Sequence, residues 1–239
     1  MRSIVDAAQR SSVLRVRDLS VLRGSSTTIE AAALDLPEPG IAALVGRSRE
    51  GRTALLEAIA GLLPATGSVK LDSESIDHLG GVDRARRGIV LAPRRGEVFS
   101  RLTVAEHVLL AGDAGPRGGA SPLLTPSLAR LVDARAEQRA ETLSGGERRL
   151  LALAMVTLRS PRVVLLDEPS EGVARALLPE MVEALKCLAH SAAILIADSD
   201  AELLEATATS GVLLEGGAVR GAMPFAELRR TWAYREVLG

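Results

Sequence analysis

Aromatic residues are nearly absent from this chain of 239 residues, at 2% of its composition. Aliphatic side chains must therefore supply the core, and base stacking on an aromatic platform is not expected. The chain also lacks an excess of positive charge, since its formal net charge is −1, which argues against nucleic acid as the main partner. The hydrophobic share of 47% is nevertheless sufficient for a sizeable core and excludes a disordered chain.

Cysteine and long apolar runs are equally scarce. Cys187 is the one cysteine, so no disulfide forms within the chain, and its apolar setting EALKCLA predicts a small core residue. No window approaches the ~18 uninterrupted apolar residues of a membrane helix. Residues 1–12 lack the apolar stretch of a secretory signal. We expect a soluble chain that reaches a membrane only through a partner.

Short apolar runs followed by helical patterns predict an α/β fold. The expected strands lie at 41–46, 88–93, 163–169 and 192–199, with a closing hairpin at 212–222 that turns at Gly216-Gly217. A helix is expected at 53–64, and another in AELLEATA after the strand at 192–199. Strands that alternate with helices indicate a mostly parallel sheet, covered on both faces, with ligands at the carboxyl ends of the strands.

Residues 100–160 lack strand signals and predict helices joined by a loop at 112–126, whose Gly and Pro content is typical of a mobile segment. We interpret this region as a helical subdomain inserted into the α/β core. The predicted organisation is a tail at 1–12 and a single domain at 13–239.

The segment GRSREGRT, between the first of these strands and its helix, has the frame G-x-x-x-x-G-[basic]-[ST] of a phosphate-binding loop. Backbone N–H groups and the helix N-terminus would bind phosphate oxygens there, and the Thr53 hydroxyl is placed to hold Mg²⁺. The candidate nucleotide-binding residues are Gly46, Arg47, Ser48, Arg49, Glu50, Gly51, Arg52, Thr53 and Ala54. A plain strand-to-helix turn remains the alternative, because Arg52 stands where such loops normally have Lys.

A second motif, VVLLDE, places two carboxylates at the end of a buried strand. Asp167 is the candidate Mg²⁺ ligand, and Glu168 is the candidate catalytic residue that orients the attacking water. An acidic pair at a strand end also arises by chance, so this motif gains weight only beside the others.

The third motif is LSGGE, with Leu143, Ser144, Gly145, Gly146 and Glu147 leading into a helical pattern. Ser144 can cap that helix, and the two glycines allow close backbone approach at a second anion site. A simple helix cap accounts for Ser144 but not for two consecutive glycines.

Together these motifs resemble the ABC ATPase family. The segment LSGGERRLLALAMVTLRSPRVVLLDEPSEGVA (143–174) is similar to the family's signature helix, Walker B strand and following loop, and the resemblance covers nearly the whole chain beyond the first twelve residues. EVFSRLTVAEH (97–107) and DEPSEGVA (167–174) are most similar to ATP-binding subunits of branched-chain amino-acid and urea importers. The resemblance implies a P-loop NTPase (RecA-like) fold with an antiparallel β portion, and a cytoplasmic subunit held at the inner face of the cell membrane by permease subunits.

In that family two subunits dimerise head to tail, and each ATP lies between one subunit's phosphate loop and the other's LSGGE. The resemblance therefore implies ATP and Mg²⁺ as cofactors and a second ABC ATPase subunit, identical or different, as a partner. It also implies that Ser144, Gly145 and Gly146 contact the γ-phosphate of a nucleotide held mainly by that partner.

The phosphate loop departs from the family pattern at three positions. Arg52 replaces the loop Lys, and its planar fork cannot act as a compact point charge. Arg49 stands where the family has Gly, which would cost about 1–2 kcal/mol if a positive φ were needed. Glu50 adds a negative charge beside the phosphates.

Further departures fall on the adenine, coupling and switch positions. The adenine-stacking aromatic is matched by Leu22 or Arg23, and Arg23 would stack only weakly by its guanidinium face. The glutamine that links Mg²⁺ to the membrane subunit aligns with Arg94, and the switch histidine aligns with Ser199. The three histidines, His78, His107 and His190, lie out of register and are expected to be surface or packing residues.

These departures favour a subunit whose own loop binds ATP weakly or hydrolyses it slowly, while its LSGGE completes a competent site on a different subunit. A homodimer with two slow sites and a loop that tolerates Arg52 are the alternatives within the family. Outside it, a non-catalytic regulatory module with the ABC fold is favoured by the loop but not by the DE pair or LSGGE. A soluble ABC machine acting on nucleic acid or ribosomes usually has two cassettes or long helical insertions. This chain shows neither feature, and it also lacks a basic patch.

Overall fold

The computed structural model describes residues 12–23, 26–37, 39–94, 98–113 and 124–238. Within them the strands are β1 (Ser12–Arg23), β2 (Ser26–Pro37), β3 (Gly40–Gly46), β4 (Thr66–Leu71), β5 (Glu74–Ser75), β6 (Ile89–Ala92), β7 (Val163–Asp167), β8 (Ala193–Ala197), β9 (Ser210–Glu215) and β10 (Ala218–Pro224). The helices are α1 (Arg49–Ile59), α2 (Gly81–Arg86), α3 (Val104–Asp113), α4 (Pro126–Arg135), α5 (Gly145–Leu158), α6 (Leu178–Leu188), α7 (Ala201–Thr207), α8 (Phe225–Leu228) and α9 (Trp232–Leu238). Two 3₁₀ turns, η2 (Ala140–Thr142) and η3 (Arg175–Leu177), precede α5 and α6.

The strands form one mixed sheet in the order β5-β4-β1-β2-β10-β9-β3-β8-β7-β6. Strands β9, β3, β8, β7 and β6 run parallel to their neighbours in this series. Every residue of β7 and β8 is buried, which explains their uninterrupted aliphatic sequences, because a central parallel strand is covered on both faces. The carboxyl ends of β3, β7 and β8 meet at one edge, where Asp167 pairs with Ala197.

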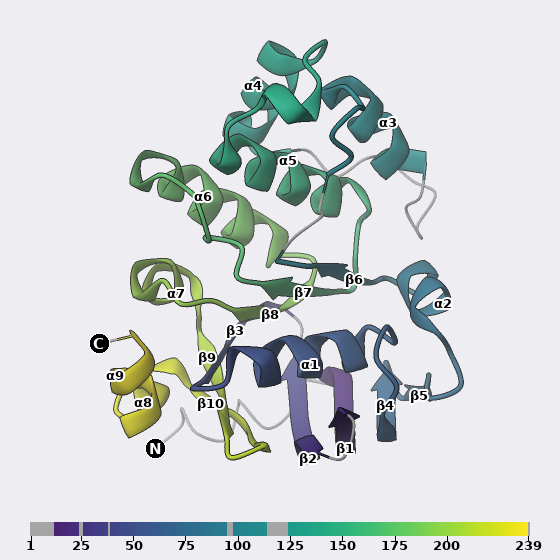
Figure 1. Cartoon of the computed structure of the whole chain (residues 1–239), viewed down its shortest axis with the longest axis vertical. Helices are drawn as coiled ribbons and strands as arrows, with labels where there is room; N and C mark the ends of the chain where they lie inside the picture. The colour runs from purple at the N-terminus through teal and green to yellow at the C-terminus, as the bar shows by residue number, and fades with distance from the viewer. Residues whose placement is uncertain (1–11, 24–25, 38, 95–97, 114–123, 239) are drawn as a thin grey trace.

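The antiparallel portion is the other half of the sheet. β1 pairs with β2 and β4, and β4 pairs with β5, all antiparallel. Helix α1 lies between β1–β2 and the parallel strands (Figure 1), and its Leu55 and Ile59 share a core with Leu14, Ile29 and Leu44. The sheet therefore bends around α1, the helix that follows the candidate phosphate loop.

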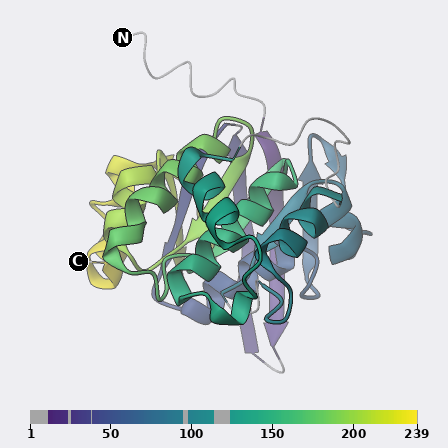
Figure 2. The ribbon, with the colours of Figure 1, turned by 90° about the horizontal axis from the view of Figure 1, so that it is seen from above.

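A second core covers the opposite face of the parallel strands, where α5, α6 and α7 pack. Leu150, Leu185 and Leu203 from these helices bury Val164 and Ile196 of the sheet. Figure 2 shows this helical cover from above, with α2 and β4 on one side and α8 and α9 on the other. Helices α3, α4 and α5 gather at the end of the molecule farthest from β1 and β2 (Figure 1), which matches the helices expected in 100–160.

The structure corrects two local predictions. Cys187 is exposed, not buried, because α6 turns Met181, Ala184, Leu185 and Leu188 toward the core and leaves position 187 on its outer face. The first helix begins at Arg49 and ends at Ile59, not 53–64. Most of the loop predicted to be mobile, residues 114–123, lies outside the described residues, as do residues 1–11. Among the described helices none is long and apolar enough to cross a membrane.

Candidate functional site

The candidate phosphate loop connects β3 to α1 and is closed into the first turn of the helix. Ser48 is the N-cap of α1: its Oγ accepts from the N–H of Gly51 at 3.0 Å, and its carbonyl accepts from the N–H of Arg52 at 3.1 Å. Two loop N–H groups that an open anion-binding loop would direct at phosphate thus have partners within the chain. Arg49 and Glu50 can both adopt helical conformation, so the helix can start directly after the Ser48 cap. This explains why α1 begins four residues earlier than predicted.

Gly46 has a packing requirement of its own. A Cβ at this position would lie 2.4 Å from the backbone oxygen of Leu214 in β9, so only glycine fits where β3 ends. Arg49, by contrast, has no positive φ. The condition for backbone strain at Arg49, a positive φ, is therefore not met in this chain.

Arg52 is buried and points across the edge of the sheet. Its Nη1 donates to the Gly46 carbonyl, and its Nη2 donates to Glu168 Oε1 at 2.5 Å. Nη2 also lies 3.4 Å from Ser199 Oγ. The charge that would replace the loop lysine is thus paired with the candidate catalytic carboxylate.

Glu168 is as fully engaged as Arg52. It is 2% exposed and has a φ of 51°, a left-handed conformation that costs about 1–3 kcal/mol in a non-glycine residue and is concentrated at functional sites. The Ser199 Oγ donates to Oε1 at 2.9 Å and the Ser199 N–H donates to Oε2 at 3.0 Å. Arg49 Nε lies 3.6 Å from Oε1. The position aligned with the switch histidine therefore contacts Glu168 directly.

The two candidate Mg²⁺ ligands lie side by side. Thr53 Oγ1 donates to Asp167 Oδ2 at 2.8 Å, and the other carboxylate oxygen, Oδ1, is buried without a hydrogen-bond partner. Burial raises the pKa of Asp167, and the hydrogen bond from Thr53 partly offsets this rise. A hydroxyl beside a carboxylate with an unused oxygen is a donor set that suits Mg²⁺.

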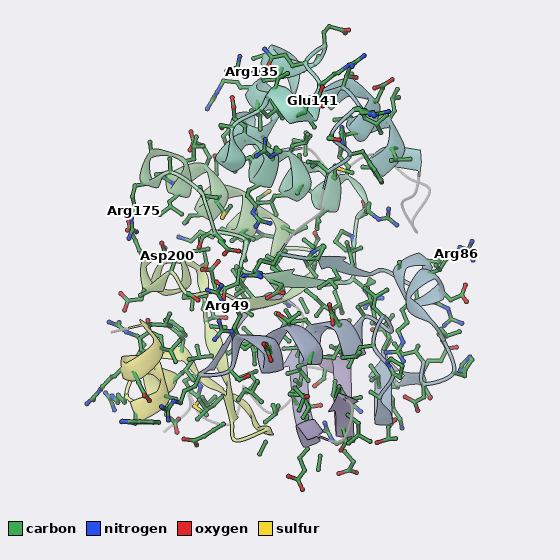
Figure 3. The ribbon with its side chains drawn as sticks, viewed as in Figure 1. Arg49, Arg86, Arg135, Glu141, Arg175 and Asp200 are labelled. Carbon is green, nitrogen blue, oxygen red and sulfur yellow. The ribbon has the colours of Figure 1, made fainter. Side chains whose placement is uncertain are left out.

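Arg94, aligned with the coupling glutamine, belongs to a charged network around Glu171. Its Nη1 lies 3.4 Å from Glu171 Oε1, and Arg49 Nη1 lies 3.6 Å from the same oxygen. Arg149 of α5 donates to the Arg94 carbonyl and to the Glu171 carbonyl. Figure 3 shows Arg49 at the start of α1, where it can reach this network. The network ties the loop to the signature helix.

The other loop residues point in different directions. Arg47 stacks on the Trp232 ring at 4.9 Å from its centroid and pairs with Glu236 at 2.8 Å, both in α9. Glu50 is exposed. Ala54 is fully buried in the core, so its side chain contributes to packing.

The signature segment forms the start of α5. Ser144 and Glu147 make a reciprocal capping box, with bonds of 3.2 and 2.9 Å, and Leu143 is buried beside them. Gly146 is buried, and a Cβ there would lie 2.7 Å from Leu177, whereas Gly145 is exposed and would meet only the Gly172 carbonyl at 3.4 Å. A side chain at position 146 would thus displace the end of the Leu177 side chain, whereas nothing in the packing of the described residues around Gly145 favours glycine.

The remaining predicted positions lie away from the carboxyl edge of the parallel strands or have side chains outside the described part of the chain. Leu22 is 63% exposed near the end of β1. Arg23 is the last residue of that strand, but its side chain, on which the stacking prediction depends, lies outside the described part of the chain. His107 is buried, whereas His78 and His190 are exposed, as expected of packing and surface residues.

Sequence reasoning missed one buried carboxylate at the site, Asp198. It accepts from the Ser170 N–H at 2.9 Å and the Ser170 hydroxyl at 2.6 Å, and burial raises its pKa. It thereby joins the loop after Glu168 to the loop that carries Ser199. The sequence shows an aspartate after a buried strand but does not indicate that it pairs with Ser170.

Comparison with known proteins shows the family and the fold of the chain. Residues 29–171 match the family model described as ABC transporter, and the chain belongs to that family. A putative ABC transporter ATP-binding protein of Streptomyces avermitilis is 35% identical over 219 residues, covering 90% of this chain but 39% of the relative. The chain thus spans well under half of that relative's length.

A second relative has nearly the same length. The high-affinity branched-chain amino acid transport ATP-binding protein BraG of Pseudomonas aeruginosa is 28% identical over 206 residues, covering 84% of this chain and 88% of BraG. A nucleotide-free ATP-binding cassette from an ABC transporter superposes with a TM-score of 0.79 at 17% identity, covering 95% of this chain and 98% of the cassette. This likeness shows the cassette fold, a P-loop NTPase with a mixed sheet, as the motifs predicted.

Proposed function

We propose that this chain is an ATP-binding subunit of an ABC transporter whose own phosphate loop binds ATP weakly or hydrolyses it slowly. Its LSGGE segment then completes the working site on a second ABC subunit. The observation that carries this proposal is the buried ion pair between Arg52 and Glu168, which occupies both the loop cation and the catalytic carboxylate.

The residues needed for hydrolysis are nevertheless present. Thr53 and Asp167 would hold Mg²⁺, which when bound offsets the charge of the phosphates. Glu168 would orient the attacking water, but its acceptor positions are engaged by Arg52 and Ser199. Residual ATPase activity at this site is therefore expected to be low.

The exposed Gly145 supports the role of the signature segment toward a partner. No packing contact in the described structure demands glycine there, whereas a phosphate lying against the start of α5 would. Ser144, Gly145 and Gly146 are proposed to contact the γ-phosphate of the partner's nucleotide, with Leu143 and Glu147 holding the segment in place.

Permease subunits are the proposed membrane partners. A largely apolar groove of about 290 Å³ is lined by Leu62, Ala85, Pro93, Met155 and other residues from the segment after α1, from α2, from β6 and its following loop, and from α5. This position suits a segment of a permease. The subunit would then be cytoplasmic and peripheral at the inner face of the membrane, as a single domain at 13–239 with its helical subdomain at about 100–160.

Import of amino acids or a similar small polar solute is the proposed transport activity. It rests on the likeness to BraG and on the segments 97–107 and 167–174, since the transported solute is not expected to contact this chain. Nucleic acid is not a proposed partner, in keeping with the net charge of −1.

Two substitutions in the assembled transporter test the asymmetry. Glu168→Gln should leave most turnover intact, because the working site belongs to the other subunit, whereas Ser144→Arg should abolish turnover. The reverse pattern would assign catalysis to this chain's own loop. Loss of turnover in both variants would favour a homodimer with two active sites.

Calorimetry with Mg-ATP tests the loop itself. Micromolar binding, about −8 kcal/mol, would mean that Arg52 is tolerated and the subunit is an ordinary ATPase. A regulatory module would bind no nucleotide and support no transport, and a soluble ABC machine would be active without permeases.

A further inference from the structure

The Arg52 side chain has few nitrogen atoms left for an incoming anion. Nη1 is occupied by the Gly46 carbonyl and Nη2 by Glu168 Oε1, with Ser199 Oγ 3.4 Å away. Nε is buried without a partner. The side chain is 3% exposed. A guanidinium can bridge two acceptors in this way because its donors lie in a rigid fork, which a lysine ammonium lacks.

Glu168 in turn supplies Arg52 with a negative charge in the place where a bound nucleotide would offer a phosphate. Both partners are almost fully buried, so removing either one leaves an uncompensated charge. Phosphate oxygens must therefore compete with Glu168 for Arg52. They must also leave the carboxylate with Ser199 and the more distant Arg49 as its remaining partners.

We infer that Glu168 holds Arg52 in a clasp that closes the phosphate loop and sets its affinity for nucleotide. The inference rests on the proposed function, in which this loop takes the phosphates of a nucleotide. It goes further by assigning the weak binding to a removable contact between two side chains and not to arginine as such. In this role Glu168 is a positioning residue for Arg52, separate from its role toward water.

The closed first turn of α1 agrees with this assignment. Arg52 donates its backbone N–H to Ser48 and its side chain to Gly46, so one residue fastens both ends of the loop. When Arg52 is released from Glu168, its side chain no longer has an anchor next to the end of β7. The loop can then open toward a phosphate without separating two buried charges.

The test is calorimetric binding of Mg-ADP to the full chain, because ADP removes any contribution from hydrolysis. Glu168→Gln keeps the shape of the side chain and removes its charge, and it should tighten Mg-ADP binding at least tenfold, about 1.4 kcal/mol. Glu168→Asp keeps the charge but shortens the side chain, and should give a smaller gain. This second variant keeps the inference testable if the first one fails to fold.

Glu171→Gln is the matched control. It removes one negative charge from the same edge, where Glu171 pairs with Arg49 and Arg94 but not with Arg52. It should change the affinity less than about twofold. An equal gain in Glu171→Gln and Glu168→Gln would overturn the clasp in favour of general electrostatic attraction.

Arg52→Lys completes the cycle. Lysine presents one nitrogen where arginine presents two and lacks the rigid fork that spans Gly46 and Glu168, so this variant should bind Mg-ADP, and adding Glu168→Gln to it should have less than about a twofold effect. A tenfold gain from Glu168→Gln in the lysine background would overturn the inference. If Arg52→Lys binds and neither Glu168 variant improves on the native chain, the clasp alone fails. If no variant binds, the loop takes no nucleotide and the clasp fails, whereas the role of LSGGE in the proposed function is tested separately by Ser144→Arg in the assembled transporter.

Discussion

The Thr53 hydroxyl donates a hydrogen bond to Asp167 at 2.8 Å, which joins α1 to the end of β7. The contact leaves the second oxygen of Asp167 buried and without a partner. An ionised carboxylate in that position is stable only with a compensating positive charge. The free chain therefore carries a cost at Asp167 that a bound cation would relieve.

Asp167→Asn should accordingly stabilise the nucleotide-free chain at neutral pH by on the order of 1–2 kcal/mol. Burial raises the pKa of Asp167 in the folded state, so the folded chain binds more protons than the unfolded chain between the two pKa values. The free energy of unfolding then falls as the pH rises through that window. The asparagine variant lacks this loss, and its advantage should disappear below the ordinary aspartate pKa.

Urea denaturation over a series of pH values measures this difference. Asp198, whose pKa burial also raises, is present in both proteins and cancels. Asp83→Asn, at an exposed carboxylate that pairs with Arg86 on α2, is the control and should change the free energy of unfolding by less than about 1 kcal/mol. An advantage of Asp167→Asn that persisted at low pH would contradict the electrostatic explanation.

Trp232 should report on the phosphate loop. It is the one tryptophan of the chain, and Arg47 of the loop stacks on its ring. Movement of the loop on binding nucleotide should change its fluorescence. Arg47→Ala should abolish that response while costing less than about 1 kcal/mol of stability, because the ion pair of Arg47 with Glu236 is partly exposed. An unchanged response in Arg47→Ala would mean that Trp232 senses another movement.

His107 should be a stability residue and not a functional one. It is fully buried, its Nε2 accepts from the Phe99 N–H at 2.8 Å, and its Nδ1 lies 2.7 Å from the Thr103 carbonyl. His107→Ala should therefore destabilise the chain by on the order of 3 kcal/mol, through lost hydrogen bonds and a cavity. His78→Ala, at an exposed position, should change stability by less than about 0.5 kcal/mol. Equal effects in denaturation would contradict the assignment.

The parallel half of the sheet could be predicted because burial on both faces demands continuous aliphatic runs. The strands β3, β6, β7 and β8 all lie where such runs predicted them. β1, β2 and β4 were not located, since their sequences mix polar and apolar residues and their pairing depends on the rest of the sheet. The exposure of Cys187 follows from the helical period of α6, which the apolar composition of its surroundings concealed.

The motifs predicted which residues meet at the edge of the sheet but not how they are paired. Gly46, Arg52, Thr53, Asp167 and Glu168 come together as the loop and strand-end motifs imply. The ion pair between Arg52 and Glu168 joins positions 116 residues apart, and a single sequence gives no sign of it. The earlier start of α1 results from a competition between a serine cap and an open loop, which the motif frame alone does not decide.

Alanine variants of the two signature glycines should differ in their effects on stability and on ATP turnover. Gly146→Ala should destabilise the isolated chain by up to about 1 kcal/mol, because its Cβ would lie 2.7 Å from a terminal methyl of Leu177, a half-buried side chain that must turn away. Gly145→Ala should leave stability unchanged or slightly higher, since alanine favours the helix and its Cβ would meet only the Gly172 carbonyl at 3.4 Å.

The effect of Gly145→Ala should appear only in the ATP turnover of the assembled transporter. If this residue faces a phosphate held by the partner, Gly145→Ala should lower ATP turnover of the transporter at least tenfold. The purified variant subunit should unfold at the same temperature as the native subunit. Thermal unfolding of the subunit and ATPase activity of the complex measure the two effects separately. Normal turnover in Gly145→Ala would mean that the exposed glycine contacts no phosphate, and the signature segment would then be a capped helix start without a role at the partner's site.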